Sequence, residues 1–441
     1  MQTVITHYKN LTRWDIKSYL CLFSSPYAVE ELGKYIYEHS EKENIGNEAE
    51  KEFPILGVTN KVGVYLNEYV RSENINQPYK KVRGGELTYN PYRVNVGSIG
   101  VIQNEYDNFY ISPAYVVFGT KEGLLNEYIY LVLSSSWFNL YLRAATSGSV
   151  RQNLTFDLLS QLKVPVPPLK IQEKIVSDWR KAQKEAQELN KQVDEREKSI
   201  GDFVLVELGM KKKEYKRAGN GFVVWFKDFE RWGIGFNDYV RQGLLDFKSK
   251  YEIFPLGKII LNFQYGTSEK ANGIKGIPIL RMNNIVSGDL DTSDLKYIEL
   301  SKKEFESLKL VKGDLLFNRT NSKELVGKTA VFNLKGDFVF ASYLIRIKID
   351  DKKADPNYIN ILFNSPIIRN QIDAISRQII GQANVNTEEL SSFKIPLPPL
   401  PKQKEIAKKV EAIRAEIAEI KSKANGILET TQKEIGEILK T

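Results

Sequence analysis

Hydrophobic positions along the chain mark out two long segments with a single narrow apolar seam. In both segments apolar residues recur at alternating spacings of four and three, and the positions between them are charged, which predicts long helices. A narrow seam suits one partner helix, so we expect the two helices to pair antiparallel as one coiled coil. The alternative is that each helix lies on its own globular domain. The seam positions are Ile175, Trp179, Leu189 and Val193, and then Ile406, Val410, Ile413, Ile417 and Ile420.

The segments outside these helices have the pattern of a mixed α/β fold. Runs of apolar, aromatic and β-branched residues at Tyr110–Phe118 and Val339–Ile349 predict strands. Helices are expected after them, near Glu127–Arg143 and Pro356–Ile375. For each long helix we expect about 28 residues, which at ~1.5 Å per residue gives ~42 Å, the length of roughly 12 base pairs of B-DNA.

The chain contains an internal repeat. The segment Pro165-Val-Pro-Pro-Leu-Lys-Ile-Gln returns as Pro396-Leu-Pro-Pro-Leu-Pro-Lys-Gln, at an offset of 396 − 165 = 231 residues. Other landmarks recur in the same order, so the chain is two copies of one unit of about 220 residues. These landmarks are Arg13-Trp14 with Arg231-Trp232, Leu32-Gly33 with Leu256-Gly257, Gly84–Asn90 with Lys312–Asn318, Tyr128 with Tyr358, and Asn153 with Asn384.

The repeat and the helix pattern together predict the domain organisation. We expect globular domains at 1–164 and 214–395, each followed by a spacer helix, at 165–213 and 396–441. The expected fold is α/β (α+β), with two similar domains separated by the antiparallel helix pair and related by a pseudo-twofold axis.

Composition narrows the chemistry. The 441 residues carry a net charge of +8 and a sequence pI near 9.0, which suits a polyanionic partner but also fits many lysine-rich proteins without one. Cys21 is the only cysteine, and His7 and His39 are the only histidines. This excludes an intrachain disulfide and a Cys/His metal cluster, and it disfavours a histidine-activated nucleophile. No phosphate-binding glycine motif is present either, so we expect no catalytic residues and no metal.

Two apolar stretches, Tyr19–Val29 and Tyr128–Leu142, are too short and too interrupted to span a membrane. We therefore expect a cytoplasmic chain that makes no contact with a membrane.

The repeated Pro-x-Pro-Pro-Leu-x-x-Gln-x-x-Ile segment, followed each time by a long helix, resembles the specificity subunit of type I restriction-modification systems. The stretches Gly313–Arg319 and Ile279–Ile285 share this resemblance, which covers essentially the whole chain. The family implies two target recognition domains on conserved helical spacers, each reading one half of a split, asymmetric sequence in double-stranded DNA. It also implies two methyltransferase subunits that use S-adenosylmethionine, and restriction subunits that use ATP and Mg and can join them. The resemblance implies no cofactor in this chain itself.

Candidate DNA contacts follow from side-chain chemistry. Asparagine can read adenine and arginine can read guanine, whereas lysine and serine suit phosphates. The alternative for each residue is a solvated or turn-forming role. The candidates are Lys80, Lys81, Arg83, Asn90, Arg93 and Ser98 in the first copy, and Arg281, Asn283, Asn284, Asn318, Arg319, Asn321 and Lys328 in the second. A basic run at Lys211–Lys213 and Lys216-Arg217 is either a phosphate contact or a solvated linker.

Asn90-Pro91-Tyr92 is similar to the Asn-Pro-Pro-Tyr motif of adenine methyltransferases but lacks one proline, and the second copy has Asn318-Arg-Thr instead. Three functions remain open from the sequence: a DNA specificity subunit, a DNA-independent scaffold of a related defence system, and a self-sufficient DNA methyltransferase. The stretches before Leu32 and Leu256 are longer than the family leads us to expect, which leaves the subtype of the system open.

Overall fold

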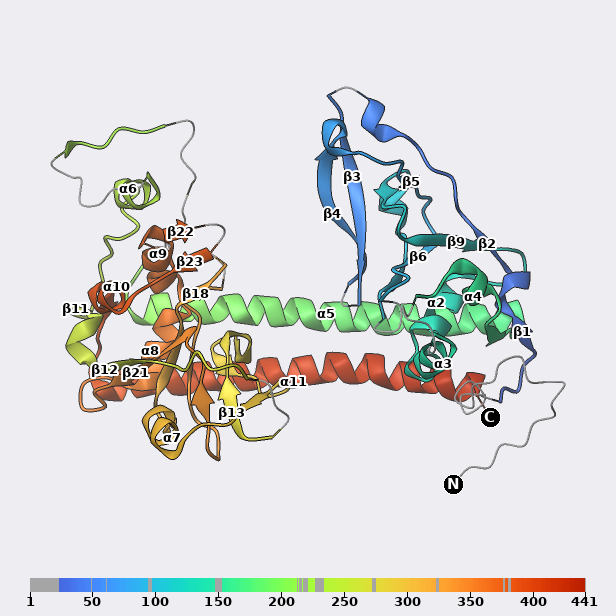
Figure 1. The fold of residues 1–441 in the computed structure, drawn as a ribbon. Coiled ribbons are helices and arrows are strands. Elements are labelled where there is room, and N and C mark those ends of the chain that lie inside the picture. Colours follow the sequence, from blue (N-terminus) through green and yellow to red (C-terminus); the bar gives the residue numbers. More distant parts are fainter. Residues whose placement is uncertain are drawn as a thin grey trace. The chain divides into compact units, whose positions relative to one another are not determined.

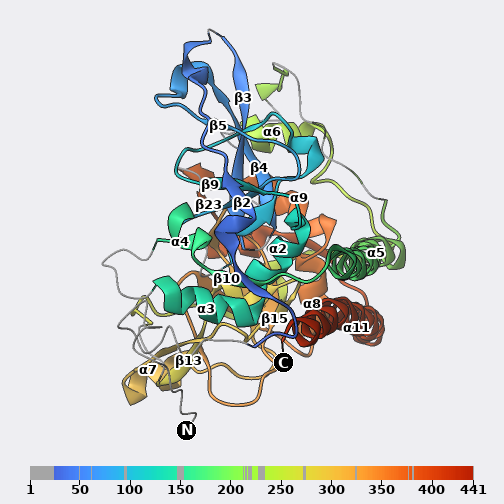
Figure 2. The ribbon, with the colours of Figure 1, turned by 90° about the vertical axis from the view of Figure 1, so that its right-hand side faces the viewer.

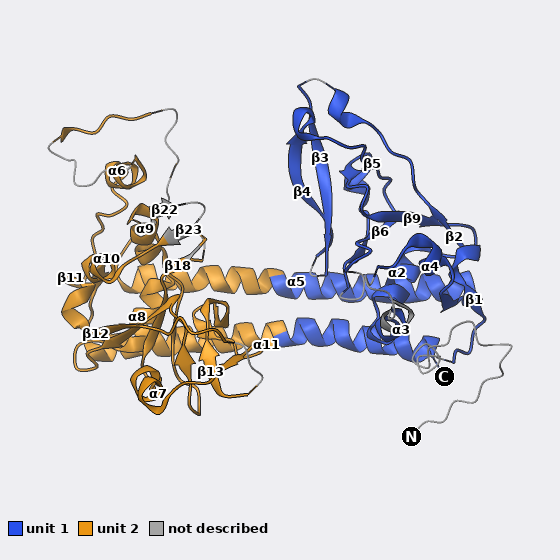
Figure 3. Ribbon diagram, viewed as in Figure 1, with its two compact units in different colours: residues 1–190, 422–441 blue, residues 191–421 orange. Residues whose placement is uncertain are grey.

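The chain divides into two compact units in a computed structural model (Figures 1 and 3). Unit 1 comprises residues 1–190 and 422–441, and unit 2 comprises residues 191–421. The structure describes residues 24–48, 50–60, 62–93, 97–146, 153–211, 213, 216, 221–226, 234–271, 275–322, 325–375, 377–379 and 382–440, with only the backbone at 143–146, 321, 377–379 and 382–383. Cys21, His7, Lys212, Arg217 and the repeated Arg-Trp pairs at 13–14 and 231–232 lie outside the described residues.

Unit 1 is built on two four-stranded sheets, ordered β2-β9-β6-β7 and β4-β3-β8-β5, and a short ribbon, β1-β10. The helices α2, α3 and α4 follow the sheets in sequence. The bounds are β1 (Val29–Glu31), β2 (Ile36–Glu38), β3 (Glu52–Thr59), β4 (Gly63–Arg71), β5 (Lys80–Lys81), β6 (Leu87–Tyr89), β7 (Ile99–Val101), β8 (Tyr110–Ile111), β9 (Val116–Thr120), α2 (Asn126–Ser134), α3 (Ser136–Thr146), α4 (Phe156–Ser160) and β10 (Lys163–Pro165).

Unit 2 repeats the same plan with additional short strands. Its main sheet has the order β12-β21-β17-β19, and its ribbon is β11-β24. The bounds are α6 (Ile234–Arg241), β11 (Ile253–Pro255), β12 (Ile260–Tyr265), β13 (Ile277–Leu280), β14 (Ile285–Val286), β15 (Asp289–Leu290), β16 (Lys296–Ile298), α7 (Lys302–Leu308), β17 (Leu315–Asn318), β18 (Thr320–Asn321), β19 (Thr329–Val331), β20 (Val339–Phe340), β21 (Leu344–Ile349), α8 (Pro356–Phe363), α9 (Pro366–Ile375), β22 (Arg377–Ile379), β23 (Gln382–Asn384), α10 (Thr387–Ser392) and β24 (Lys394–Pro396).

The strand pairings confirm that the sequence repeat is a structural duplication. Each main sheet places its central pair, β9-β6 or β21-β17, between equivalent outer strands. Each unit also has one parallel pair, β3 with β8 and β13 with β20, at equivalent positions. The mixed α/β fold expected from the sequence is therefore present in both copies.

Each of the two segments expected to form one strand, Tyr110–Phe118 and Val339–Ile349, in fact forms two strands that belong to different sheets. Tyr110–Phe118 divides into β8 and β9, and Val339–Ile349 divides into β20 and β21. Between them the backbone turns, with the Tyr115 N–H donating to Ser112 O at 3.0 Å and the Leu344 N–H donating to Ala341 O at 2.9 Å. The first turn contains Ser112-Pro113, a turn signal that the expectation of one strand overlooked, whereas the second, at residues 341–343, contains neither glycine nor proline.

The expected helices after these strands are also divided. The first ends at Ser134, because Ser135 is extended with ψ of 145°, and α3 begins at Ser136. The second ends at Phe363, and Pro366, which has no N–H and restricts the residue before it, begins α9.

The long helices α5 (Leu169–Glu207) and α11 (Leu400–Leu439) contain 39 and 40 residues. At ~1.5 Å per residue each is ~60 Å long, so the expected 28 residues were too few. The expectation counted only the heptad seam, whereas both helices begin directly after the Pro-Pro pair and extend past the last seam position. All nine predicted seam residues are buried or half-buried.

The two helices run antiparallel within each unit, where Figures 1 and 2 show their segments side by side. In unit 2, residues near the end of α5 contact residues near the start of α11, and residues earlier in α5 contact residues later in α11. In unit 1, Ile175 and Val176 of α5 share a core with Ile435 and Leu439 of α11. The unit 2 contacts are Glu207 with Lys402 at 2.7 Å, the Phe203 ring with Lys409 Nζ at 5.5 Å, Arg196 with Glu416, and Glu197 with Lys421 at 2.9 Å.

The glutamine of the repeated motif fixes the start of each long helix to its own globular domain. Gln172 is fully buried; its amide donates to Gly123 O and Pro167 O, both at 2.9 Å, and accepts from the Leu125 N–H at 2.9 Å. Gln403, also fully buried, makes the equivalent bonds to three backbone groups. It donates to Pro398 O at 2.7 Å and Lys353 O at 3.3 Å, and it accepts from the Asp355 N–H at 2.8 Å.

A buried tyrosine completes each junction. The hydroxyl of Tyr128 on α2 donates to Pro165 O at 2.8 Å, and that of Tyr358 on α8 donates to Pro396 O at 2.7 Å. A proline carbonyl in the ribbon strand is thus bonded to the helix that packs beside it. The Pro-Pro-Leu-x-x-Gln motif recurs because both copies need the same hydrogen-bonded junction.

Candidate nucleic-acid interface

An asparagine lies at the end of a central strand in each main sheet, Asn90 after β6 and Asn318 in β17, and forms hydrogen bonds within the loop that follows. We call the described residues 90–93 and 97–98 site loop 1, and the described residues 318–322 and 325–328 site loop 2. In site loop 1 the side-chain oxygen of Asn90 accepts a hydrogen bond from the Tyr92 N–H at 3.0 Å. In site loop 2 the Asn318 amide donates to Leu325 O at 3.0 Å, and the Asn318 N–H donates to Lys328 O at 2.9 Å. Both asparagines therefore shape their loops.

The two site loops are held in the same way against the segment that leads into α4 or α10. The Leu154 N–H donates to Pro91 O at 3.0 Å, and the Val385 N–H donates to Arg319 O at 3.0 Å. These bonds hold Leu154 and Val385, and with them the preceding repeated asparagines Asn153 and Asn384, close to the loops in space. The same part of each unit therefore presents polar side chains from two segments that lie far apart in the chain.

Site loop 2 presents an arginine among aromatic and small polar residues. The Arg319 guanidinium lies over the Tyr265 ring, 4.8 Å from its centre. Tyr265 is 42% exposed, and Tyr343, whose carbonyl accepts from the Arg319 N–H at 3.0 Å, is 53% exposed. Beside them the Thr320 hydroxyl donates to the side-chain oxygen of Asn384 at 3.2 Å, across the β18-β23 pair.

Site loop 1 presents a different set of residues at the equivalent place. Tyr92 is 57% exposed and Arg93 is exposed. Pro91 occupies the position that corresponds to Arg319, because Asn90 corresponds to Asn318. The two units therefore share a loop scaffold and differ in the side chains that it carries.

Four of the predicted contacts are buried and bonded inside the chain: Lys80, Ser98, Asn284 and Asn318 are 4%, 4%, 2% and 1% exposed. The Lys80 ammonium donates to Tyr115 O at 3.1 Å, and burial lowers the pKa of Lys80. Asn284 donates to Asp291 O at 2.9 Å and Asp294 O at 3.1 Å and accepts from the Arg281 N–H. Their burial leaves no surface for DNA, so we do not propose these four residues as contacts.

The remaining candidates are distributed over several turns. Lys81 is paired with Glu43 at 3.7 Å and Arg281 with Asp294 at 3.0 Å, so their charges are partly neutralised. Arg83, at the opposite end of β6 from site loop 1, and Asn283, after β13, are exposed. Lys328 is half-buried at the end of site loop 2, and only the backbone of Asn321 is described.

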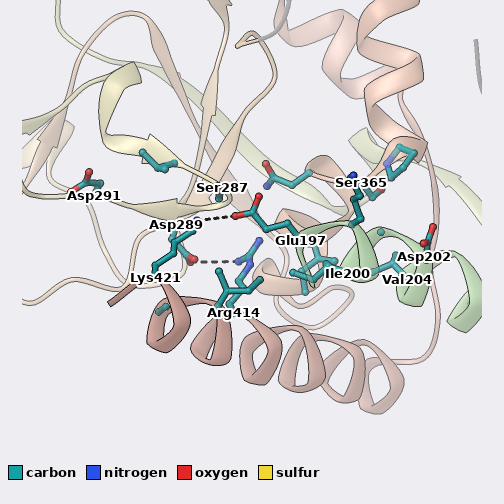
Figure 4. A pocket seen from close by; sticks show the side chains of 18 of the residues that line it. Glu197, Ile200, Asp202, Val204, Ser287, Asp289, Asp291, Ser365, Arg414 and Lys421 are labelled. Carbon is teal, nitrogen blue, oxygen red and sulfur yellow. Dashed lines mark hydrogen bonds and ion pairs between the residues drawn. The ribbon is translucent and has the colours of Figure 1, made fainter. Parts of the chain in front are cut away.

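A cavity of about 850 Å³ lies in unit 2 between α5, α8, α11 and the β14-β15 hairpin (Figure 4). Two ion pairs line it, Arg414 with Asp289 at 3.4 Å and Lys421 with Glu197 at 2.9 Å. Asn360 donates to Gly288 O at 2.8 Å, which holds the hairpin tip over the cavity.

The described residues contain no group of three or more His, Cys, Asp or Glu side chains placed to hold a metal ion. No helix in the described part of the chain is long and apolar enough to cross a bilayer.

The two copies correspond to the two regions matched by a known family model. The model of the type I restriction modification DNA specificity domain matches residues 40–196 and 248–430. The chain belongs to this family. The EcoKI type I restriction enzyme specificity subunit of Escherichia coli K12 is 28% identical over 308 residues, 67% of this chain and 60% of that protein.

Two further similarities accompany this match. A protein named as the MjaX type I restriction enzyme specificity subunit of Methanocaldococcus jannaschii is 32% identical over 161 residues, 36% of this chain and 38% of that protein. The chain thus spans 60% and 38% of the length of these two curated relatives. A chain in a solved structure of a type I R-M system, 14% identical, matches 95% of this chain and 99% of its own length with a TM-score of 0.49.

The structure adds to the candidate interface three residues that were not among the predicted contacts: Tyr265, Thr320 and Asn384. Tyr265 is the last residue of β12 and is far from site loop 2 in sequence. No sequence pattern around Tyr265 indicates that its ring would stack against the Arg319 guanidinium. Thr320 directly follows the predicted Arg319. Asn384 carried a signal, since it repeats Asn153, but the repeat does not say what the position contacts.

Proposed function

We propose that this protein is the DNA specificity subunit of a type I restriction-modification system. In this role it catalyses nothing itself, and each unit reads one half of a split, asymmetric site. The observation that carries the proposal is the duplication: both copies of the family domain end their central strand in a loop of the same scaffold with different polar and aromatic side chains. One scaffold with two different loops suits the reading of two unlike half-sites.

The chemistry of the site loops suits a DNA duplex. Arginine donates two hydrogen bonds to a guanine edge, and asparagine and threonine bond adenine or the backbone. Exposed tyrosines offer flat surfaces beside these donors. The excess of eight positive charges favours approach to a polyanion and predicts binding that weakens as salt is added.

The partners we propose are two methyltransferase subunits that carry S-adenosylmethionine and modify adenine, and restriction subunits that use ATP and Mg and can join them. Such a complex works in the cytoplasm, where the DNA lies. Ile175 and Trp179 of α5 share a core with the end of α11 in unit 1, and Ile406 and Val410 of α11 share a core with the end of α5 in unit 2. We expect the outer, charged faces of the helices to be available to these partners.

The proposal is tested by co-expressing the chain with a methyltransferase subunit encoded beside it and sequencing the host DNA for modified adenine. We expect one motif with two short specific parts and a gap of fixed length. An assembled complex without a motif would favour the scaffold function. A motif produced by this chain alone with S-adenosylmethionine would favour a self-sufficient methyltransferase.

A further inference from the structure

Arg319 differs from the other arginines of unit 2. Among the arginines of this unit whose side chains the structure describes, it alone has no carboxylate within 4.0 Å. Its side-chain Nε is buried without a hydrogen-bond partner in the described part of the chain, but so are those of Arg281 and Arg346, and the missing carboxylate is what sets Arg319 apart. The others are paired: Arg196 with Glu416, Arg241 with Asp238 at 2.7 Å, Arg281 with Asp294 at 3.0 Å, Arg346 with Asp314 at 3.5 Å, Arg369 with Asp373, and Arg414 with Asp289 at 3.4 Å.

The position of Arg319 is nevertheless fixed. Its N–H donates to Tyr343 O and its carbonyl accepts from the Val385 N–H, both at 3.0 Å, and its guanidinium rests on the Tyr265 ring. A stacked guanidinium loses little side-chain freedom when it binds, so its donors are already oriented.

We propose that Arg319 reads a guanine in the half-site bound by unit 2, and that Thr320 and Asn384 contact the neighbouring base pair. This inference rests on the proposed function. The planar guanidinium matches the two acceptors, O6 and N7, on the major-groove edge of guanine. The Thr320-Asn384 pair beside it is neutral and retains amide donors on Asn384, which suits a base edge better than a phosphate.

Unit 1 cannot make the same contact. Pro91 stands at the equivalent position and has no side-chain donor. A guanine contact from this position is therefore specific to unit 2, in agreement with two half-sites of different sequence.

The test compares the methylated motif of the assembled wild-type complex with that of Arg319→Ala. We expect one guanine position in one half of the motif to become degenerate, with discrimination there falling roughly tenfold to a hundredfold. The other half of the motif is expected to stay unchanged. Arg241→Ala, which removes a paired arginine from the same unit, serves as the matched control and is expected to leave the motif intact.

Arg319→Lys and Tyr265→Phe separate base reading from charge and from folding. Lysine keeps the charge but not the planar fork, so Arg319→Lys is expected to methylate efficiently and still lose the guanine preference. Tyr265→Phe keeps the stacking surface and is expected to keep the motif, whereas Tyr265→Leu is expected to weaken the preference. Thermal unfolding of each complex distinguishes these effects from loss of the fold.

Three outcomes would overturn the inference. Uniformly weaker methylation with an unchanged motif would show that Arg319 contacts phosphate, and an unchanged motif at an unchanged level would show no contact. A degenerate position that is not guanine would also reject it. Failure of the proposed function looks different, because the wild-type complex itself would then give no motif.

Discussion

Two residue types, glutamine and tyrosine, connect each long helix to its globular domain. Gln172 and Gln403 each bond three backbone groups, and Tyr128 and Tyr358 each bond a proline carbonyl. These hydrogen bonds are buried or part-buried, so a substitution that removes one partner leaves the others unsatisfied, at a cost of about 1–3 kcal/mol for a fully buried group and less for one that water can reach. The cost makes the junctions sensitive to single substitutions.

We expect Gln403→Ala to lower the free energy of unfolding by about 2–4 kcal/mol, since one buried and two part-buried backbone groups lose their partner. Gln172→Ala should have a similar effect through unit 1. Denaturant titration of the purified chain measures both. Gln187→Ala, at an exposed position on α5, is the control, and the expected change there is within about 0.5 kcal/mol. Equal changes in the free energy of unfolding for all three variants would show that the hydrogen bonds of Gln172 and Gln403 do not stabilise the helix starts.

The junction tyrosines predict a loss of stability in alkali. Burial raises the pKa of Tyr128 and of Tyr358 above the ordinary tyrosine range, and it raises the pKa of Tyr110 to about 12, with a contribution from Glu43. Because the folded pKa exceeds the unfolded value, their stabilisation is complete below pH ~10 and is lost as the pH rises above it.

Unfolding titrations between pH 8 and pH 12 test this dependence. Tyr358→Phe is expected to be about 1 kcal/mol less stable than the wild type at pH 8 and to lose less stability than the wild type above pH 10. Parallel curves for the two proteins would mean that ionisation of Tyr358 plays no part in the loss.

At the scale of elements, the sequence predicted those features that depend on regular spacing. The seam from Ile406 to Ile420 identified α11, and the repeated proline motif located both helix starts. We did not predict the division of the 110–118 and 339–349 segments between two sheets, because the Ser112-Pro113 signal lies inside an otherwise apolar run and the second turn has no glycine or proline.

In the site, residue type made Arg319 and Arg93 candidates for DNA contact, and they stay predictions. It could not show that Asn318 and Lys80 face inward, since tertiary packing decides burial.

Two glycines, one inside α11 and one in the hairpin beside it, are expected to respond oppositely in stability when each is replaced by alanine. Gly426 lies inside the helix, and a Cβ there would meet nothing within 4 Å. Gly426→Ala is therefore expected to stabilise the chain by about 0.5–1 kcal/mol through helix propensity. Gly288 has φ of +89°, and a Cβ there would lie 2.1 Å from Arg414 Nη2. Gly288→Ala is expected to destabilise by about 1–3 kcal/mol.

Thermal unfolding of the two glycine variants side by side makes the comparison, with the wild type as reference. A stabilising Gly288→Ala would show that the hairpin tip is not held over the unit 2 cavity as described. A destabilising Gly426→Ala would show that the α11 surface at this position is closely covered.

At the scale of the whole molecule, the two units are expected to contribute to DNA recognition separately. Arg93 and Arg319 belong to equivalent loops of different units, and no residue of either loop is shared. On the proposed function, Arg93→Ala and Arg319→Ala should weaken DNA binding by the assembled complex by free energies that add within about 0.5 kcal/mol in the double variant.

Titration of labelled duplex DNA at fixed salt measures these free energies, and the motif of each single variant shows which half-site changed. Changes confined to different halves, together with additive energies, are the expected result. A double variant no weaker than one single variant would mean that the two loops act at one place on the DNA.

The way the helices are divided between the units has a consequence for synthesis on the ribosome. Unit 2 is one continuous stretch, 191–421, whereas the core of unit 1 includes Ile435 and Leu439 near the end of α11. Most of the unit 1 core is made within the first 190 residues, but the part that α11 covers stays open until about 250 further residues have been translated, which takes roughly 10–50 s at ordinary rates. The nascent first domain therefore exposes the apolar face of α5 around Ile175 during that interval, and its core is completed only when synthesis of the chain reaches the end of α11.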